Sequence, residues 1–362
     1  MKNLTVSELL HRASVQFKNS IAFVFPEENK QVTFAELDRE SDKVAKALLN
    51  MGFSYDAKIG IWSTNSTRWL YVAMGAAKIG AVIVPLNVAC RMDEVVDMCK
   101  TADVNLLFAM EKFKNVHSVE YLSDHYKKNG RVNKENFPSL HTIYSTEDTT
   151  EWADSAWQDF IENAAYVSDE ELEAAKQKVV SEDLYVIQFT SGTTAKPKGA
   201  MITHSGAINC AFEYVKRFHL DSEDITYAPL PLFHCFGNVL TLLGTLISGG
   251  KIFYPPAFSV RGALEVLDKE KCSCFMGVPA MYSMLIYNEN FDSSKVHIKK
   301  AGIGGAFCPP ALADKIEEKF KMHHLVVGYG LSEVSSVCCF SDISLKSLTP
   351  SLTLRPAIRS SA

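Results

Sequence analysis

The stretch Phe189-Thr190-Ser191-Gly192-Thr193-Thr194-Ala195-Lys196-Pro197-Lys198-Gly199 begins at the last residue of segment 184–189, which is apolar and typical of a buried strand. It combines hydroxyl side chains with two glycines and two lysines. Glycine lets backbone N–H groups turn toward a ligand, hydroxyls donate to phosphate oxygens, and lysine adds a mobile positive charge. The order of strand and polar loop therefore predicts a site for a polyphosphate.

A flexible polar turn has a similar composition and is the alternative interpretation of this stretch. Two well-known nucleotide loops do not match. Pro197 stands where a Walker loop has its second glycine, and Gly302-Ile303-Gly304-Gly305-Ala306-Phe307 ends in phenylalanine where a dinucleotide fingerprint has a small residue. The sequence thus predicts a phosphate-binding loop of another kind.

Strand-like and helix-like segments alternate on both sides of the loop. Before it, residues 58–62, 68–78 and 81–84 predict a βαβ unit, and residues 111–180 predict a polar, solvated connection with one or two helices of its own. After it we expect a helix over 205–217, strands at 225–229, 251–254, 274–277, 299–303 and 325–328, and helices at 238–247, 260–268, 279–287 and 309–319. This alternation predicts an α/β fold of parallel sheets flanked by helices.

Composition excludes several classes of protein. The chain has 362 residues, 47% of them hydrophobic, and a net charge of −5, so it can bury a large core and lacks the basic balance of a dedicated nucleic-acid binder. Its nine cysteines form no CxxC pair, which indicates buried free thiols rather than a zinc site or disulfide framework. The best apolar run, residues 239–247, is much shorter than the ~20 residues a bilayer crossing needs, so no transmembrane segment is predicted.

Four segments resemble, in order, the motifs of the AMP-forming acyl-adenylate ligases, the superfamily of acyl-CoA synthetases, firefly luciferase and nonribosomal adenylation domains. The loop resembles TSGTTGxPKG with Ala195 for the central glycine, and residues 231–237 (Pro-Leu-Phe-His-Cys-Phe-Gly) resemble the acyl-pocket motif. Gly304-Gly305-Ala306 resembles the adenine-flanking turn, and residues 328–333 resemble the YGxTE motif with Ser332 for threonine. The resemblance spans about Thr5 to Val337, and the medium-chain fatty acyl-CoA synthetases look closest.

The resemblance implies a role for each motif. The loop would bind the β- and γ-phosphates of ATP through Thr190, Ser191, Gly192, Thr193, Thr194, Ala195, Lys196, Pro197, Lys198 and Gly199, with Lys198 as the main charge partner. Gly305, Ala306 and Tyr329 would flank the adenine. Gly330 belongs to the same nucleotide motif as Ser332, which would donate to the α-phosphate.

Two further residues would serve the chemistry itself. Glu333 would help to hold Mg²⁺, which prefers oxygen ligands and shares them with phosphates. His234 would lie beside the substrate carboxylate. Lys198, His234 and Glu333 are thus the candidate catalytic residues, because two anions must meet and their charge must be neutralised.

Each of these residues also has a purely structural interpretation. His234 stands between apolar neighbours and would suit a buried core histidine. Glu333 would suit a carboxylate at a helix start, and Tyr329 would suit a packed core residue.

The family also implies later segments: an aspartate that grips the ribose, a hinge, and a small domain with a catalytic lysine. Residues 341–362 match none of these. We therefore expect residues 1–340 to form an incomplete N-terminal AMP-binding domain, with the C-terminal small domain absent. Residues 341–362 would be an irregular tail, either an exposed arm or a segment unrelated to the fold.

The resulting hypothesis is an acid–thiol ligase that converts a carboxylic, and by its apolar pocket motif fatty, acid to an acyl-CoA thioester through an acyl-adenylate, using ATP, Mg²⁺ and coenzyme A. The alternatives are an inactive nucleotide- or acyl-binding remnant and an adenylator with another acceptor. For this chain we expect binding of ATP with Mg²⁺ and little or no thioester formation. No organelle address is evident, so the cytoplasm is the default and the mitochondrion stays open for a longer parent form. The sequence does not set the acyl chain length or the oligomeric state.

Overall fold

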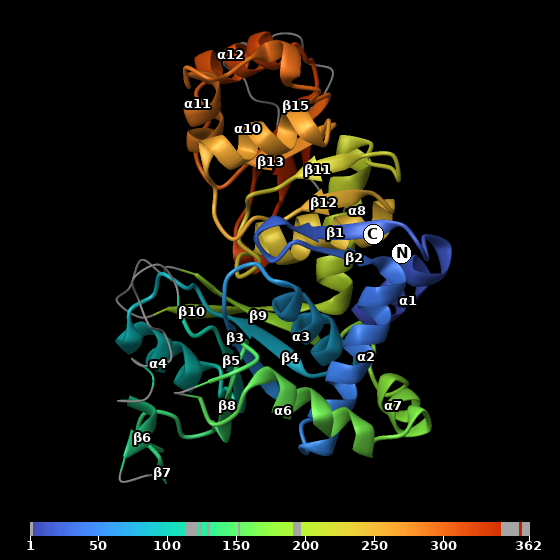
Figure 1. Cartoon of the computed structure of the whole chain (residues 1–362), viewed down its shortest axis with the longest axis vertical. Helices are drawn as coiled ribbons and strands as arrows, with labels where there is room; N and C mark the ends of the chain where they lie inside the picture. The colour runs from blue at the N-terminus through green and yellow to red at the C-terminus, as the bar shows by residue number, and fades with distance from the viewer. Residues whose placement is uncertain are drawn as a thin grey trace.

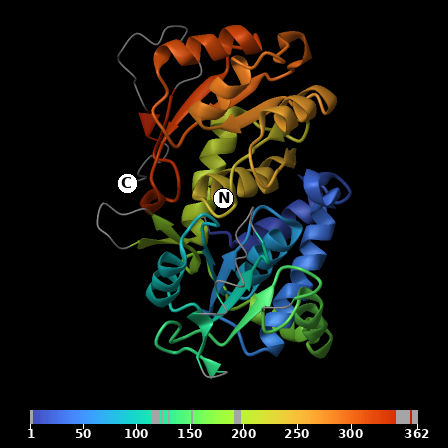
Figure 2. The same ribbon diagram turned by 60° about the vertical axis from the view of Figure 1, so that its left-hand side comes forward.

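The computed structural model describes residues 3–112, 122, 125–128, 131–150, 153–190, 197–341 and 355–356. Within these residues two large sheets are stacked along the long axis of the molecule, with helices packed around both (Figure 1). The turned view in Figure 2 shows the two sheets as separate lobes joined by segments from the middle of the chain. Of the phosphate loop, residues 191–196 lie outside the described part of the chain.

The first sheet has six strands in the order β10-β9-β4-β3-β5-β8. Its strands are β3 (Lys58–Trp62), β4 (Val82–Pro85), β5 (Leu106–Ala109), β8 (Thr142–Ser145), β9 (Leu184–Thr190) and β10 (Lys198–Thr203). All neighbours are parallel except β9 and β10, which form an antiparallel pair. The inner strands are buried almost throughout, as strands covered on both faces must be.

The second sheet has nine strands in the order β17-β16-β15-β14-β13-β11-β12-β1-β2. Its strands are β1 (Ile21–Phe25), β2 (Lys30–Thr33), β11 (Ile225–Tyr227), β12 (Lys251–Phe253), β13 (Cys274–Gly277), β14 (Lys300–Ile303), β15 (Leu325–Tyr329), β16 (Cys339–Phe340) and β17 (Arg355–Pro356). The strands from β1 to β15 run parallel, and β2, β16 and β17 are antiparallel additions at the two edges. A further pair, β6 (Lys127–Lys128) and β7 (Arg131–Val132), stands apart.

Helices cover both sheets. They are α1 (Val6–Gln16), α2 (Phe34–Asn50), α3 (Thr67–Lys78), α4 (Met92–Thr101), α6 (Trp157–Glu162), α7 (Asp169–Lys176), α8 (His204–Phe218), α9 (Leu242–Ser248), α10 (Val260–Lys269), α11 (Pro279–Ile286) and α12 (Pro310–Phe320). Short 3₁₀ turns cover Pro26–Glu28, Asn163–Tyr166, Ser293–Lys295 and Ser332–Val334. Figure 1 shows α10, α11 and α12 on the nine-stranded sheet and α1, α2, α6 and α7 beside the six-stranded one. No helix among the described residues combines the length and apolarity that a bilayer crossing requires.

The predicted α/β architecture is confirmed, with two local differences that shape the site. Where a helix was expected from residue 238, the chain forms a π-helix over Phe236–Thr241 before α9 begins. The Thr241 hydroxyl donates to the carbonyls of Phe236 and Gly237 at 3.2 and 3.0 Å, which occupies backbone acceptors of this turn. Gly237 packs so closely on Pro231 that a Cβ would lie 2.3 Å from the Pro231 carbonyl oxygen.

The second difference concerns the end of the phosphate loop. Lys198 and Gly199 were expected in the loop, but they begin strand β10, where Lys198 is the register partner of Thr190 and Gly199 that of Phe189. Pairing with β9 explains the difference, because it satisfies backbone groups that an open loop would leave to solvent. The two ends of the loop are thereby held side by side.

Candidate functional site

A cavity of about 450 Å³ opens between the β9–β10 pair, the π-helix and the carboxyl ends of β14 and β15. Open parallel sheets bind ligands outside the carboxyl ends of their strands, so this is where the fold favours a site. The lining includes seven residues singled out from the sequence: Thr190, Lys198, His234, Gly305, Gly330, Ser332 and Glu333. Residues far apart in the chain are thus brought to one place.

The phosphate loop is represented at this cavity by its two ends. Thr190 ends β9 and Lys198 begins β10, and both line the cavity. Pro197 and Gly199 do not line it. Ser191, Gly192, Thr193, Thr194, Ala195 and Lys196 fall outside the described residues.

His234 lies on the cavity wall with its side chain exposed, which does not match a buried core histidine. Its Nδ1 accepts a hydrogen bond from the Phe236 N–H at 3.1 Å, so the neutral ring carries its proton on Nε2. Surrounding protein atoms disfavour the imidazolium form. The Cys235 thiol, whose Sγ lies 3.8 Å from Nδ1, outweighs this effect and raises the pKa of His234.

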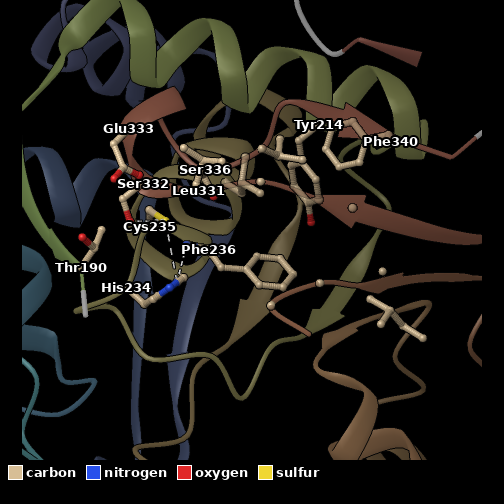
Figure 3. A pocket seen from close by; sticks show the side chains of 18 of the residues that line it. Thr190, Tyr214, His234, Cys235, Phe236, Leu331, Ser332, Glu333, Ser336 and Phe340 are labelled. Atoms are coloured by element: carbon tan, nitrogen blue, oxygen red, sulfur yellow. Dashed lines mark hydrogen bonds between the residues drawn. The ribbon is translucent and has the colours of Figure 1, made fainter. Parts of the chain in front are cut away.

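Cys235 is the buried neighbour that completes this pair, and Figure 3 draws its contact with the His234 ring. Burial alone would raise the pKa of the Cys235 thiol, but the His234 imidazole together with the Ser332 and Ser336 hydroxyls lowers it below its ordinary value. Sγ also lies 3.8 Å from the Ser332 hydroxyl. The pair therefore links the segment around His234 to the 3₁₀ turn at Ser332–Val334.

Ser332 and Glu333 reach the cavity from that turn, which follows β15 after a sharp bend. Gly330 makes the bend: a Cβ there would lie 1.8 Å from the Ser336 carbonyl oxygen, so no other residue fits. Figure 3 shows Glu333, Ser332, Thr190 and His234 gathered at one end of the cavity. The turn is a single three-residue 3₁₀ segment, too short for a helix-dipole explanation of Glu333.

Of the three residues expected beside the adenine, one lines the cavity and two do not. Gly305 lines the cavity with φ of +77°, a conformation that glycine adopts without strain. Ala306 and Tyr329 do not line it, and Tyr329 is 58% exposed. Tyr329 is thus no core residue, and two of the three expected neighbours lie outside the cavity lining.

At the apolar end of the cavity, the sequence predicted Phe236, which stands in the acyl-pocket motif at residues 231–237. The other side chains of this end come from α8, the π-helix and the segment that ends at β16, and they were not predicted: Tyr214, Phe218, Leu240, Val337 and Phe340. Tyr214 and Phe218 are one helical turn apart on α8, with ring centroids 4.9 Å apart. Their i,i+4 spacing was visible, but such a spacing is equally typical of a helix face packed on a core.

The residues present fit a magnesium ion that shares its ligands with phosphate. Glu333 is the single acidic side chain among the cavity-lining residues that the structure describes, and the Thr190 hydroxyl lines the same cavity. Over the described ranges no three His, Cys, Asp or Glu side chains are grouped as a metal site. Mg²⁺ binds through one or two carboxylates plus water and phosphate oxygens, so a single glutamate is consistent with it.

The fold and the order of the motifs agree with the family that the sequence resembles. The chain matches the AMP-binding enzyme family over residues 10–356 and belongs to that family, as its motifs predicted. It is 33% identical over 361 residues to an acyl-CoA ligase, sidI, of Beauveria bassiana, covering 98% of this chain and 61% of that protein. It is 29% identical over 350 residues to the medium-chain acyl-CoA ligase ACSF2, mitochondrial, of Danio rerio, covering 93% and 57%.

Solved structures agree on the fold. The crystal structure of the anthranilate CoA ligase AuaEII in complex with anthranoyl-AMP superimposes with a TM-score of 0.81 at 20% identity, covering 94% of this chain and 62% of that one. This confirms the fold expected of the superfamily's large N-terminal domain. The chain spans about three-fifths of the length of the curated relatives it matches.

Proposed function

We propose that this protein activates a carboxylic acid with ATP and passes the acyl group to coenzyme A. The acid's carboxylate oxygen attacks the α-phosphorus, pyrophosphate leaves, and an acyl-adenylate forms. The thiol sulfur of coenzyme A then attacks the acyl carbon, and AMP leaves. The observation that carries the proposal is a single cavity with two unlike ends. Its apolar end lies at the C-terminal part of α8, and its polar end is formed by Thr190, Lys198, His234 and Glu333.

The polar end suits the phosphates. Lys198 supplies a positive charge and Thr190 a hydroxyl donor at the two paired ends of the loop. Ser332 would donate to the α-phosphate, and Glu333 would hold Mg²⁺, which when bound neutralises charge on the phosphates. Because both reactants are anions, positioning and charge neutralisation are the chemistry these residues must supply.

His234 would orient the acid. Since Nδ1 is already bonded to the Phe236 N–H, the Nε2 proton is the one left to donate to a carboxylate oxygen. This proton favours a carboxylate held at the junction of the polar and apolar ends.

The apolar end favours a fatty or aromatic acid. Phe236, Leu240, Val337 and Phe340 offer hydrocarbon surface and no charge. We propose a fatty acid of medium length, in line with the name of the Danio rerio relative. The cytoplasm remains the default compartment, with the mitochondrion, the compartment in that relative's name, as the alternative for a longer form.

Binding tests the proposal without depending on complete turnover. Titration calorimetry with an acyl-sulfamoyl adenosine, a stable mimic of an acyl-adenylate, should show saturable binding, and so should titration with ATP and Mg²⁺. Glu333→Gln should weaken the binding of ATP with Mg²⁺ and leave the binding of the metal-free mimic nearly unchanged. A protein that binds neither ligand would contradict the proposal.

A further inference from the structure

The hydroxyl of Tyr214 is the unexplained polar group at the apolar end of the cavity. The side chain is 2% exposed and lines the cavity from α8. Within the part of the chain that the structure describes, its hydroxyl makes no hydrogen bond. Figure 3 shows the ring extending from α8 beside Phe340, with the hydroxyl at the end turned away from the helix.

The oxygen of this hydroxyl is not fully enclosed by protein atoms, so water can reach it in the empty cavity, and an apolar ligand that displaced this water would leave the hydroxyl unpaired. Phenylalanine would fill the same space against Phe218 and Gly244 without that cost; the Tyr214 ring lies so near Gly244 that a Cβ there would be 2.7 Å from it. The other side chains at this end, Phe218, Phe236, Leu240, Val337 and Phe340, offer no polar atom. The hydroxyl therefore has no hydrogen-bond partner among these side chains, and a bound ligand could supply one.

We propose that Tyr214 selects an acid that carries a hydrogen-bonding group, such as a hydroxyl or carbonyl, at the end remote from its carboxylate. This inference rests on the proposed function and deepens it. The carboxylate lies at His234, the hydrocarbon chain runs along Phe236 and Leu240, and the remote polar group meets the Tyr214 hydroxyl. A plain hydrocarbon tail would leave that hydroxyl unpaired in the complex. A binding site disfavours an apolar analogue when the analogue leaves one of its polar groups without a hydrogen bond.

A bound water molecule is the alternative partner for the Tyr214 hydroxyl. Tyr214 also borders a second, much smaller cavity of about 10 Å³, lined by Asp224, Thr241 and Thr245 among others. That volume is about the smallest that holds one water molecule. If such a water alone satisfied the hydroxyl, Tyr214 would stabilise the fold and would not discriminate between acids.

The experiment measures discrimination rather than affinity alone. The probes are acyl-sulfamoyl adenosines in matched pairs from butanoyl to octanoyl, one member of each pair plain and the other bearing a terminal hydroxyl. Dissociation constants are measured by calorimetry for the wild-type protein, for Tyr214→Phe, and for Tyr185→Phe as control. Tyr185 is fully buried, its hydroxyl has no partner among the described residues, and it does not line the cavity.

At the chain length that reaches Tyr214, the wild-type protein should favour the hydroxylated probe over its plain partner. Tyr214→Phe should shift the ratio of the two constants toward the plain probe on the order of tenfold, the usual effect of one hydrogen bond lost from a buried site. Tyr185→Phe should leave the ratio unchanged, and thermal unfolding confirms that each variant is folded. A ratio that Tyr214→Phe does not move at any chain length overturns the inference while the proposed function stands. A protein that binds no probe overturns both.

Discussion

His204 and His234 make the same hydrogen bond in opposite surroundings. Each accepts a backbone N–H through Nδ1 at 3.1 Å, His204 from Val6 and His234 from Phe236. His204 is completely buried at the start of α8, and burial lowers its pKa to about 4 although Asp183 opposes the shift. His234 faces an open cavity, and the pKa of its ring is raised. Surroundings, rather than the local bond, separate a residue that holds the fold from one for which we propose a role in the chemistry.

The largest effect should come from removing the structural histidine. His204→Ala leaves the Val6 N–H without its buried partner and opens a space beside Tyr185, whose ring lies 5.6 Å away. We expect a loss of about 4 kcal/mol in the free energy of unfolding, measured by urea denaturation. Binding of an acyl-adenylate mimic by the folded fraction should stay unchanged, and a large drop in that affinity would break the distinction between the two histidines.

Acid should reproduce much of this effect. The folded-state pKa of His204, about 4, lies below its ordinary value of 6.5, so the unfolded chain takes up the proton first as the pH falls. Stability is therefore complete above pH 6.5 and is lost between 6.5 and 4, by up to about 3 kcal/mol. His204→Gln, which keeps an acceptor but does not titrate, should flatten that part of the stability curve.

Two carboxyls with lysine partners titrate below that window. Burial favours protonation of Asp38 and Asp224, but their lysine partners Lys78 and Lys300, together with hydrogen bonds to each carboxylate, outweigh it and hold the pKa of each carboxyl below the ordinary 3.8. Their loss of stability therefore begins at lower pH. An equal slope in wild type and His204→Gln between pH 6.5 and 4 would assign the acid sensitivity elsewhere.

Removing the cavity histidine should act on chemistry instead. His234→Ala should slow acyl-adenylate formation about a hundredfold, the usual loss when one positioned donor is removed from a charged transition state. Acid-dependent exchange of pyrophosphate into ATP measures this step. The unfolding free energy should change little, because the side chain is exposed. A large drop in stability with unchanged exchange would reverse the roles assigned to the two histidines.

The smallest effect should distinguish the two halves of the nucleotide site. Lys198→Ala should weaken the binding of ATP with Mg²⁺ about tenfold, since one charge-assisted contact to phosphate is removed. It should leave an acyl-sulfamoyl adenosine, which has no β- or γ-phosphate, nearly unaffected. Equal weakening of both ligands would place Lys198 at another part of the nucleotide.

Sequence patterns predicted the fold well because its strands and helices differ in periodicity and length. The alternation from residue 58 onward gave elements whose bounds agree within a few residues with β3, α3, β9, α8 and the strands from β11 to β15. The hairpin of β1 and β2 was not predicted, since only the pairing of β1 with the distant β12 makes it part of a sheet. Long-range pairing of this kind leaves no local pattern.

The candidate site was predictable where short motifs carry it and not where packing makes it. His234, Ser332 and Glu333 stood in motifs and line one cavity. Tyr214 did not, because a helix pattern does not tell whether an apolar face meets a core or a cavity. The π-helix that turns Phe236 toward the cavity depends on the Thr241 hydroxyl and on the contact of Gly237 with Pro231, which no periodicity reveals.

The most direct test is a crystal structure of the protein with an acyl-sulfamoyl adenosine bound. The account predicts ligand density in the cavity, with the acyl group between His234 and Tyr214 and the nucleotide near Gly305 and Ser332. A second cavity of comparable size, about 470 Å³, lies near Arg68 and Glu147. Density there, with the first cavity empty, would contradict the proposal that this site activates a carboxylic acid.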